Sequence, residues 1–330
     1  MGSGIVEVFA RSNFEVVALA DSGFAVDLGK ENLANSIQRA ISKSVLTEKQ
    51  ADDLSNRITW TMDFGLMSEC DLVIEATPEL MGIKHHVFAH LDEVVSAQCV
   101  LATNTSSLSV NEIAQATRFP ERVIGMHFFN PAPVQKFVEL VRTQSTSSVI
   151  MQEVVRLVET IDKQYVVVGD EPGFIVNRLL LAYLNHAAVL ADDGVATFSQ
   201  IDFAMRELGQ YPLGPFELLD LIGIDTAFEI LQTLEVGLQD AKFAPSPSIR
   251  SRFADGKFGR KSGFGFYSYP RDVNVTNEIG YDLEVQIFLT LQTALHQSAK
   301  EMAASGYASE SEIDTALKLG CGFPKGLFES

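Results

Sequence analysis

Short apolar runs alternate with stretches of helical periodicity in the first half of the chain. The apolar runs are nearly continuous, as is typical of strands that are covered on both faces of a parallel sheet. They are residues 14–20, 71–76, 99–103, 122–128, 136–141 and 164–168. Helical patterns lie between them, near residues 4–12, 29–43, 80–96, 107–116 and 147–161. Strands that alternate with helices predict a doubly wound α/β sheet over residues 1–170.

The chain changes character from residue 171 onward, where helical patterns replace the strand-like runs. These patterns cover residues 175–193, 198–208 and 218–234, and they resume from about Leu283. Residues 244–248 and 256–269 are rich in Gly, Pro and Ser, which indicates loop or linker. We therefore predict an all-α domain over residues 171–280.

An internal repeat occurs within this helical part. Residues 187–217 align without gaps on residues 299–329, at a spacing of 112 residues. The alignment pairs turn residues as well as apolar positions: Gly194 with Gly306, Asp202 with Asp314, Pro212 with Pro324, and Gly214 with Gly326. Helical periodicity alone would not match turn glycines and prolines. We predict that residues 281–330 are a partial second copy of the helical domain.

Composition and charge narrow the class of protein. The 330 residues are 46% hydrophobic and 21% charged, which excludes global disorder, and the formal net charge is −18 at pH 7. Such a charge argues against nucleic acid or an anionic membrane as the main partner. The sequence shows neither an apolar run of about 20 residues nor an export signal, and its three cysteines lack metal-ligand spacing. We expect a soluble, cytoplasmic protein with reduced thiols.

His127 and Glu139 are the first candidates for chemistry. His127 ends a strand-like run, where a doubly wound sheet places its ligand crevice, and Glu139 lies on the next strand-like run. Two adjacent strands joined by a turn could bring Glu139 to one imidazole nitrogen and leave the other to act as a base. The alternatives are a structural histidine and an exposed strand carboxylate.

Polar residues 104–107 (Asn-Thr-Ser-Ser) follow another apolar run and would face the same crevice. Capping of the next helix explains one or two of the four, and the others could hydrogen-bond a ligand. Asn177 lies one turn into the first helix of the second half. For Asn177, an ordinary helix-surface amide is an equally good interpretation.

These motifs together resemble the L-3-hydroxyacyl-CoA dehydrogenase family, the NAD-dependent oxidoreductases of fatty-acid β-oxidation. The resemblance runs in the family's order across nearly the whole chain. It rests on DLVIEA from Asp71, NTSSL from Asn104, HFFNP from His127, FVEL from Phe137, PGFIVNR from Pro172, YPLGPFEL from Tyr211 and GRKSGFGFY from Gly259. The resemblance implies a Rossmann-like NAD-binding domain, an acyl-CoA substrate and a possible homodimer through the helical domain.

The resemblance also implies roles for single residues in the reaction. His127 matches the histidine that takes the hydroxyl proton while hydride leaves C3 of the substrate for the nicotinamide. Glu139 matches its acidic partner. Ser106 and Asn177 match residues that hydrogen-bond the reacting oxygens. The partial second copy has Leu289 where Asn177 would fall, so we expect it to be structural.

Further positions match the cofactor and CoA sites of the family. Around the nicotinamide end these are Ala76, Glu79, Lys84 and Asn104. The CoA handle would lie near the helix at residues 29–43, where the candidate phosphate contacts are Lys30, Arg39 and Lys43. Solvated surface side chains are the more common interpretation of such cations.

The chain departs from the family's pattern at its start. The family begins with a β-strand and a Gly-x-Gly-x-x-Gly turn, whereas here only the third glycine is present, as Gly2, which would permit close helix–sheet packing. The first strand of the sheet is therefore missing, and its absence would open the hydrogen-bond ladder. The acid expected for the adenosine ribose comes one position late, as Asp21, with Ala20 at the matching place. We expect either a fragment or mis-started reading frame, or a rearranged domain that binds NAD poorly.

Three functions stay open at this point. The first is NAD-dependent oxidation of an L-3-hydroxyacyl-CoA to the 3-ketoacyl-CoA, or the reverse. The second is a catalytically silent, truncated paralogue that binds acyl-CoA or a protein partner. The third is a dehydrogenase of a free 3-hydroxy acid.

Overall fold

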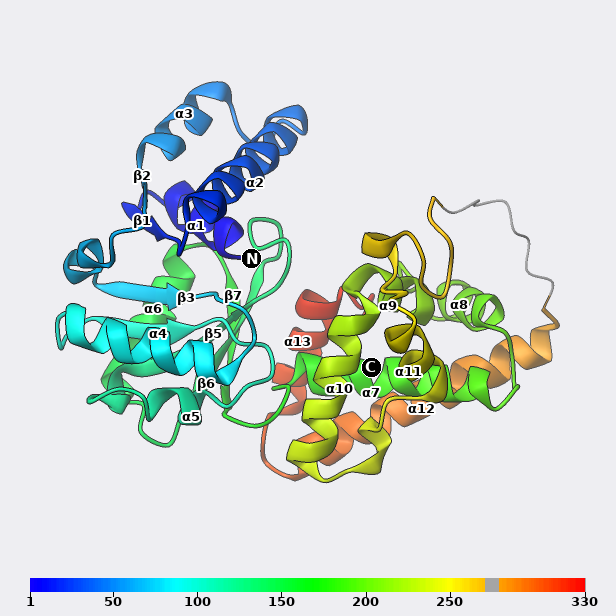
Figure 1. Ribbon diagram of the computed structural model, residues 1–330. Coiled ribbons are helices and arrows are strands. Elements are labelled where there is room, and N and C mark those ends of the chain that lie inside the picture. Colours follow the sequence, from blue (N-terminus) through cyan, green and yellow to red (C-terminus); the bar gives the residue numbers. More distant parts are fainter. Residues whose placement is uncertain (271–278, 330) are drawn as a thin grey trace. The chain divides into compact units, whose positions relative to one another are not determined.

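A computed structural model gives the fold of the chain (Figure 1) and describes residues 1–270 and 279–329. The chain divides into two compact units, Met1–Asp170 and Glu171–Ser330. Residues 271–278, just before the predicted start of the second helical copy, lie outside the described residues, as does Ser330 at its end.

Seven strands are described in the first unit. They are β1 (Val16–Leu19), β2 (Ile58–Thr61), β3 (Leu72–Glu75), β4 (Val100–Thr103), β5 (Val123–Phe128), β6 (Phe137–Arg142) and β7 (Gln164–Gly169). Five of them form a sheet in the order β3-β4-β5-β6-β7, which is parallel except for the antiparallel pair β5–β6. The mostly parallel sheet confirms the predicted α/β class.

β1 and β2 pair with each other in parallel and form a separate two-stranded sheet. Within the described part of the chain, no strand joins β1 to β3. The hydrogen-bond ladder is therefore open between these two strands, as the sequence predicts.

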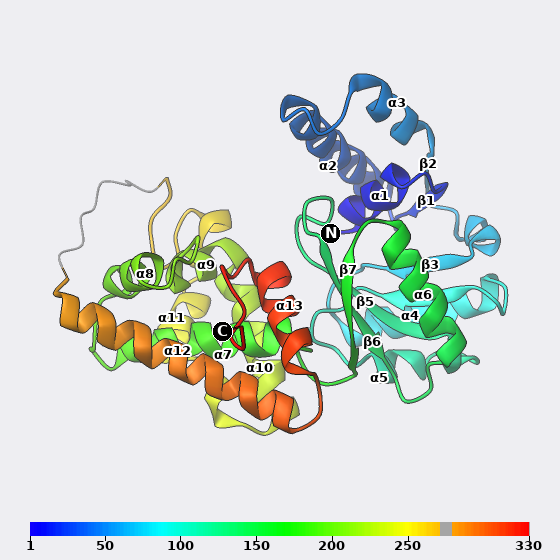
Figure 2. The same cartoon turned by 180° about the vertical axis from the view of Figure 1, so that it is seen from behind.

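Helices cover both faces of the five-stranded sheet. Figure 1 shows α4 and α5 in front of the sheet, and Figure 2, from behind, shows α6 in front. The core packs α1 and α6 against the central strands through Phe9, Val154, Ile124 and Val138. The bounds are α1 (Gly2–Arg11), α2 (Gly23–Ser42), α3 (Glu48–Asn56), α4 (Met81–Val94), α5 (Val110–Ala114) and α6 (Ser148–Thr160), with short 3₁₀ turns η1 (Phe64–Glu69) and η2 (Pro120–Arg122).

The sequence analysis missed β2 and α3 and placed the start of α2 too late. α2 begins at Gly23 because the side chain of Ser22 caps it, accepting a hydrogen bond from Ala25 N at 3.3 Å. α3 begins with a capping box between Thr47 and Gln50, a four-residue signature that was present in the sequence. β2 (Ile-Thr-Trp-Thr) alternates apolar residues with threonine and so lacks the continuous apolar run that marked the other strands.

The second unit is helical, as predicted. It contains α7 (Val176–Asp192), α8 (Phe198–Glu207), α9 (Pro215–Ile222), α10 (Ile224–Leu238), α11 (Pro247–Ala254), α12 (Tyr281–Ala304) and α13 (Glu310–Cys321), with 3₁₀ turns η3 (Ala241–Phe243) and η4 (Arg260–Ser262). None of the helices in the described part of the chain is both long and apolar enough to cross a membrane.

Two predictions in this unit were wrong. The single helix expected over residues 218–234 is two helices, because Gly223 has φ of 105° and interrupts the helical path between α9 and α10. The stretch rich in Gly, Pro and Ser was expected to be loop, yet Ser246 caps a helix that starts at Pro247. Proline is well tolerated at the first helical position, so it marks a helix start here.

The internal repeat is visible in matching local contacts at α8 and α13 and in the turns that follow these two helices. α8 starts with a capping box between Thr197 and Gln200, and α13 starts with one between Ser309 and Glu312, at the same spacing of 112 residues. The following turns also correspond: Gly214 N donates to Glu217 at 3.0 Å, and Gly326 N donates to Glu329 at 2.9 Å. The partial copy therefore repeats the local geometry of the first.

Candidate active site

His127 and Glu139 face each other across the antiparallel strands β5 and β6. They are direct register partners, and His127 Nδ1 lies 2.7 Å from Glu139 Oε2. His127 is 6% exposed and Glu139 is fully buried. A carboxylate at Nδ1 favours the tautomer that carries its proton there, which leaves the lone pair on Nε2. The structure thus brings together the two residues that the sequence singled out for proton transfer.

The loop after β4 lies against the end of β5. Asn104 Oδ1 accepts a hydrogen bond of 2.8 Å from Phe128 N, the residue that follows His127. The amide of Asn104 therefore fixes the loop relative to the strand end that carries the imidazole. The sequence analysis expected Asn104 near the nicotinamide and did not foresee this backbone contact.

Glu79 organises the rest of that loop. Its Oε1 accepts hydrogen bonds from Thr105 Oγ1 (2.5 Å), Ser106 N (2.8 Å) and Ser107 N (3.1 Å), and Ser106 Oγ lies 3.3 Å from the same oxygen. Burial alone would raise the pKa of Glu79. The hydrogen bond from Thr105 and the positive charge of Lys84 outweigh burial, so the pKa lies below its usual value. Glu79 is therefore an ionised anchor for the loop that carries Ser106.

Lys84 is almost fully buried and makes ion pairs within the protein. Its Nζ lies 2.9 Å from Glu75 Oε1 and 3.4 Å from Glu79 Oε2. Glu75 also accepts a hydrogen bond of 2.7 Å from Thr103 Oγ1 at the end of β4. The sequence analysis missed Glu75, although it ends an apolar strand as a buried acid. The three charges connect the ends of β3 and β4 to the start of α4.

Asp170 is a second acid that the sequence analysis missed. Its carboxylate accepts hydrogen bonds from Ser109 Oγ (2.7 Å), Val110 N (2.9 Å) and Asn111 N (2.7 Å) at the start of α5. The signal was an acid directly after the apolar run at residues 164–168. Glu79 and Asp170 thus hold the two ends of the loop between β4 and α5.

The N-terminus of α1 and the end of β1 offer groups that fit a dinucleotide. No side chain caps α1, so its first amides suit a phosphate group, and Asp21 follows β1 as an exposed acid suited to hydroxyl groups. A Cβ added at Gly2 would meet only Ala76 Cβ, at 3.9 Å, which is an ordinary contact. Gly2 and Ala76 are therefore neighbours, and the space at position 2 would also accept a Cβ.

Of the cations proposed for the CoA handle, Lys30 and Arg39 lie on α2, and Lys43 follows its last residue as the C-cap. Lys30, Arg39 and Lys43 are all exposed. At about 100° per residue, Lys30 and Arg39 lie on opposite sides of the helix, roughly 180° apart, whereas Arg39 and Lys43 share a side. One phosphate group can therefore contact Arg39 and Lys43 together, but not all three cations at once.

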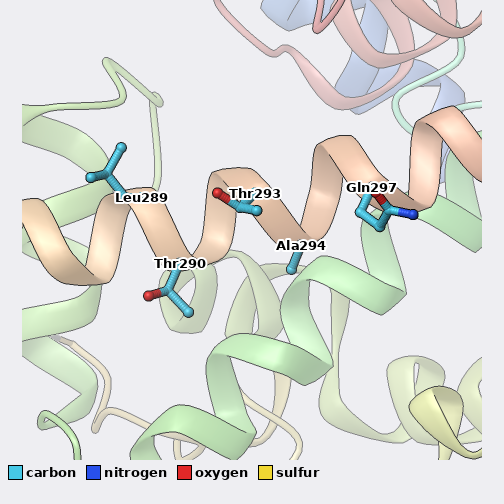
Figure 3. Close-up of a pocket in the computed structure, with 5 residues that line it drawn as sticks. All are labelled: Leu289, Thr290, Thr293, Ala294 and Gln297. Carbon is cyan, nitrogen blue, oxygen red and sulfur yellow. The ribbon is translucent and has the colours of Figure 1, made fainter.

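Asn177 is half-buried in the first turn of α7, in the second unit. The described residues of the partial copy do not repeat an amide at this position. Its α12 carries a surface pocket, shown in Figure 3, that is lined by Leu289, Thr290, Thr293, Ala294 and Gln297. None of these side chains titrates, and Leu289 stands at the position that corresponds to Asn177.

A buried imidazole–carboxylate pair at the end of a strand in a nucleotide-binding type of sheet is typical of a nicotinamide-dependent dehydrogenase. The sequence matches the NAD-binding domain of 3-hydroxyacyl-CoA dehydrogenase over residues 1–171 and the C-terminal domain of the same enzyme over residues 173–269. The chain belongs to the 3-hydroxyacyl-CoA dehydrogenase family, which comprises NAD-dependent oxidoreductases, and its first unit is the NAD-binding domain.

Relatives with curated names agree with this assignment. The chain is 38% identical to 3-hydroxybutyryl-CoA dehydrogenase of Clostridioides difficile, over 82% of this chain and 96% of the relative. It is 38% identical to the mitochondrial hydroxyacyl-coenzyme A dehydrogenase of Sus scrofa, over 82% of this chain and 88% of the relative. The crystal structure of 3-hydroxybutyryl-CoA dehydrogenase from Escherichia coli superimposes with a TM-score of 0.90 at 27% identity, covering 99% of this chain and 88% of that one.

Proposed function

We propose that the protein oxidises an L-3-hydroxyacyl-CoA to the 3-ketoacyl-CoA with NAD, or catalyses the reverse reduction, with His127 as the general base. The observation that carries this proposal is the 2.7 Å contact between His127 Nδ1 and the buried carboxylate of Glu139. The relatives named as 3-hydroxybutyryl-CoA dehydrogenases support the acyl-CoA substrate.

The residues divide the reaction between them. His127 Nε2 takes the proton of the C3 hydroxyl. NAD, when bound, would supply the acceptor for the hydride that leaves C3. Glu139 holds the ring by its Nδ1–H and stabilises the imidazolium that forms. Ser106 and Asn177 hydrogen-bond the oxygens of the substrate and so orient C3. In the reverse direction His127 returns the same proton to the carbonyl oxygen.

The cofactor would be held by the first turn of α1 and by groups that follow β1, β3 and β4. The first turn of α1, beginning at Gly2, binds the pyrophosphate, and Asp21 binds the adenosine ribose. The nicotinamide end is surrounded by four residues: Ala76, Glu79, Lys84 and Asn104. Glu79 and Asn104 act there partly through the loop that they fix, because both make hydrogen bonds to its backbone or to the next strand.

The remaining assignments concern the substrate handle and the assembly. Lys30 and Arg39 on α2 and Lys43 at its C-terminal cap contact the phosphates of CoA, with Arg39 and Lys43 on one side. Residues 171–280 form the substrate and dimerisation domain, and residues 281–330 form a partial second copy. The protein is cytoplasmic and can form a homodimer through the helical domain.

The decisive experiment replaces His127 by glutamine. His127→Gln should lower the turnover of acetoacetyl-CoA with NADH by at least ~100-fold, the usual scale of general acid–base catalysis. The dissociation constant of NADH, measured by its fluorescence, should stay the same. A mild loss of turnover would remove His127 from the mechanism.

The open ladder between β1 and β3 supports a second candidate, a catalytically silent paralogue that binds acyl-CoA or a protein partner. A central sheet that lacks one strand exposes core and can weaken the dinucleotide site. Titration of the purified chain with NADH separates the two candidates. Saturable binding favours the dehydrogenase, and no saturable binding favours the silent paralogue.

A further inference from the structure

Lys163 is a buried lysine that the mechanism above does not use. It lies between α6 and β7 and is 8% exposed. The preceding residue, Asp162, has a positive φ of 55°. Its Nζ donates hydrogen bonds to Ala132 O (2.9 Å) and Gln135 O (2.5 Å). Both acceptors are backbone carbonyls of the turn that joins β5 to β6.

The charges around Lys163 make its burial costly. Burial has the largest effect and, with the positive charges of Lys136 and Arg11, lowers the pKa of Lys163 to about 8, although the nearby Asp162 acts in the opposite direction. A buried ammonium is unfavourable unless its contacts compensate for the lost water. Here the compensation comes from the charge of Asp162 and from two carbonyl dipoles of a single turn.

That turn is close to the reacting groups along both strands. His127 lies three residues before Asn130, and Glu139 lies two residues into β6, so the turn closes the register that pairs them. The turn also lies beneath the start of α1, because a Cβ added at Gly4 would be 3.4 Å from both Ala132 Cβ and Pro133 Cδ. A shift of the turn would therefore move Glu139, the partner of the His127 imidazole, together with the first turn of α1.

We propose that Lys163 is a positioning residue of the dehydrogenase: its ammonium fastens the β5–β6 turn and so holds His127 against Glu139. This inference rests on the proposed function for its kinetic part. Its structural part, the geometry of the imidazole–carboxylate pair, stands on the contacts alone. Lys163 touches neither substrate nor cofactor in this scheme.

The test compares Lys163→Met with Lys136→Met. Methionine keeps the length of the side chain and removes its charge and donors. Lys136 is a suitable control because it is an exposed lysine of the same turn, next to Gln135, and is ion-paired with Asp162 instead of bound to the turn's carbonyls. Two quantities are measured at a temperature where both variants are folded by circular dichroism: steady-state kinetics with acetoacetyl-CoA and NADH, and the downfield proton resonance of the His127 Nδ1–H, identified by its loss in His127→Gln.

Lys163→Met should lower kcat by on the order of 10-fold, with KM for acetoacetyl-CoA changed by less than about twofold, because the base is misplaced and not removed. It should also shift or broaden the Nδ1–H resonance, which Lys136→Met should leave in place. An unchanged resonance, or a kcat within about twofold of Lys136→Met, overturns the proposal. If Lys163→Met loses only thermal stability, while its Nδ1–H resonance and kcat stay as they are in Lys136→Met, the proposal is rejected as well.

Two provisions keep the outcome decisive. If Lys163→Met does not fold, Lys163→Gln replaces it, with the same criteria, since the amide retains one donor group. If the wild-type chain does not reduce acetoacetyl-CoA, the proposed function fails, and the resonance alone decides whether Lys163 holds the pair. Failure of the inference and failure of the proposed function are thus distinguished.

Discussion

Asp202 and Asp314, which are 112 residues apart, fasten equivalent turns in the two helical copies. Asp202 accepts hydrogen bonds from Phe216 N (2.8 Å) and Glu217 N (3.1 Å). Asp314 accepts them from Leu327 N (2.6 Å) and Phe328 N (3.2 Å). In each copy a carboxylate on one helix therefore satisfies the amides that follow the next turn, which explains why the repeat retained its acids and turn glycines together.

Asp202 should make the stability of the protein depend on pH. Burial, together with the charge of Glu217, raises the pKa of Asp202 to about 7, although hydrogen bonds from Tyr267 and the backbone oppose the change. The folded state thus binds a proton that an unfolded aspartate releases near pH ~3.9. The contribution of this group to stability is full below that pH and is lost as the pH rises towards 7.

Asp202→Asn should remove this dependence. We expect the free energy of unfolding of the wild type, minus that of the variant, to decrease as the pH rises from about 4 to about 7. Urea unfolding of both proteins at several pH values in this range measures the difference. A difference that stays constant, or increases with pH, would contradict the prediction.

Glu139→Gln tests the partner of the imidazole. The amide fills the same buried space and can still accept the Nδ1–H, but it carries no charge to stabilise the imidazolium. We expect kcat to fall by at least ~10-fold with the affinity for NADH unchanged. Steady-state kinetics and NADH fluorescence check this, and a wild-type kcat would show that the charge of Glu139 has no role.

Glu79→Gln tests the anchor of the loop that carries Ser106. A neutral amide accepts the three neighbouring hydrogen bonds less well, so the loop should loosen and the protein should lose about 1–3 kcal/mol of stability near pH 7. KM for acetoacetyl-CoA should rise. The control is Glu93→Gln, an exposed glutamate on α4. Equal melting temperatures and equal KM values for the two variants would refute the role of Glu79.

A strand placed between β1 and β3 should stabilise the first unit, because it would close the open ladder. A Val/Ile-rich strand with a Gly-x-Gly turn, joined ahead of Met1, should raise both the melting temperature and the affinity for NADH. The control is a Gly/Ser-rich extension of equal length, which cannot pair or bury apolar surface. If the two extended chains melt at the same temperature, the ladder is not the weak point.

Much of the site could be predicted because its residues end strong apolar strands. His127, Asn104 and Ser106 follow such runs, and the carboxyl ends of parallel strands meet at one edge of the sheet. Glu75 and Asp170 satisfy the same criterion and were missed, because an acid after a strand is equally compatible with a solvated loop. Lys163 gave no signal at all, since nothing in a sequence tells a buried lysine from an exposed one.

The sequence pattern was enough to predict the class of the fold and the repeat in the helical part, and it made a His127–Glu139 pair one of the interpretations that stayed open. These follow from periodicity and spacing, which are local properties. Three further contacts could be found from the fold alone: Glu79 holds the serine loop, Lys84 makes buried ion pairs, and Lys163 fastens the β5–β6 turn. Such contacts join residues 5 to 31 positions apart through side-chain direction and burial, which a linear pattern does not contain.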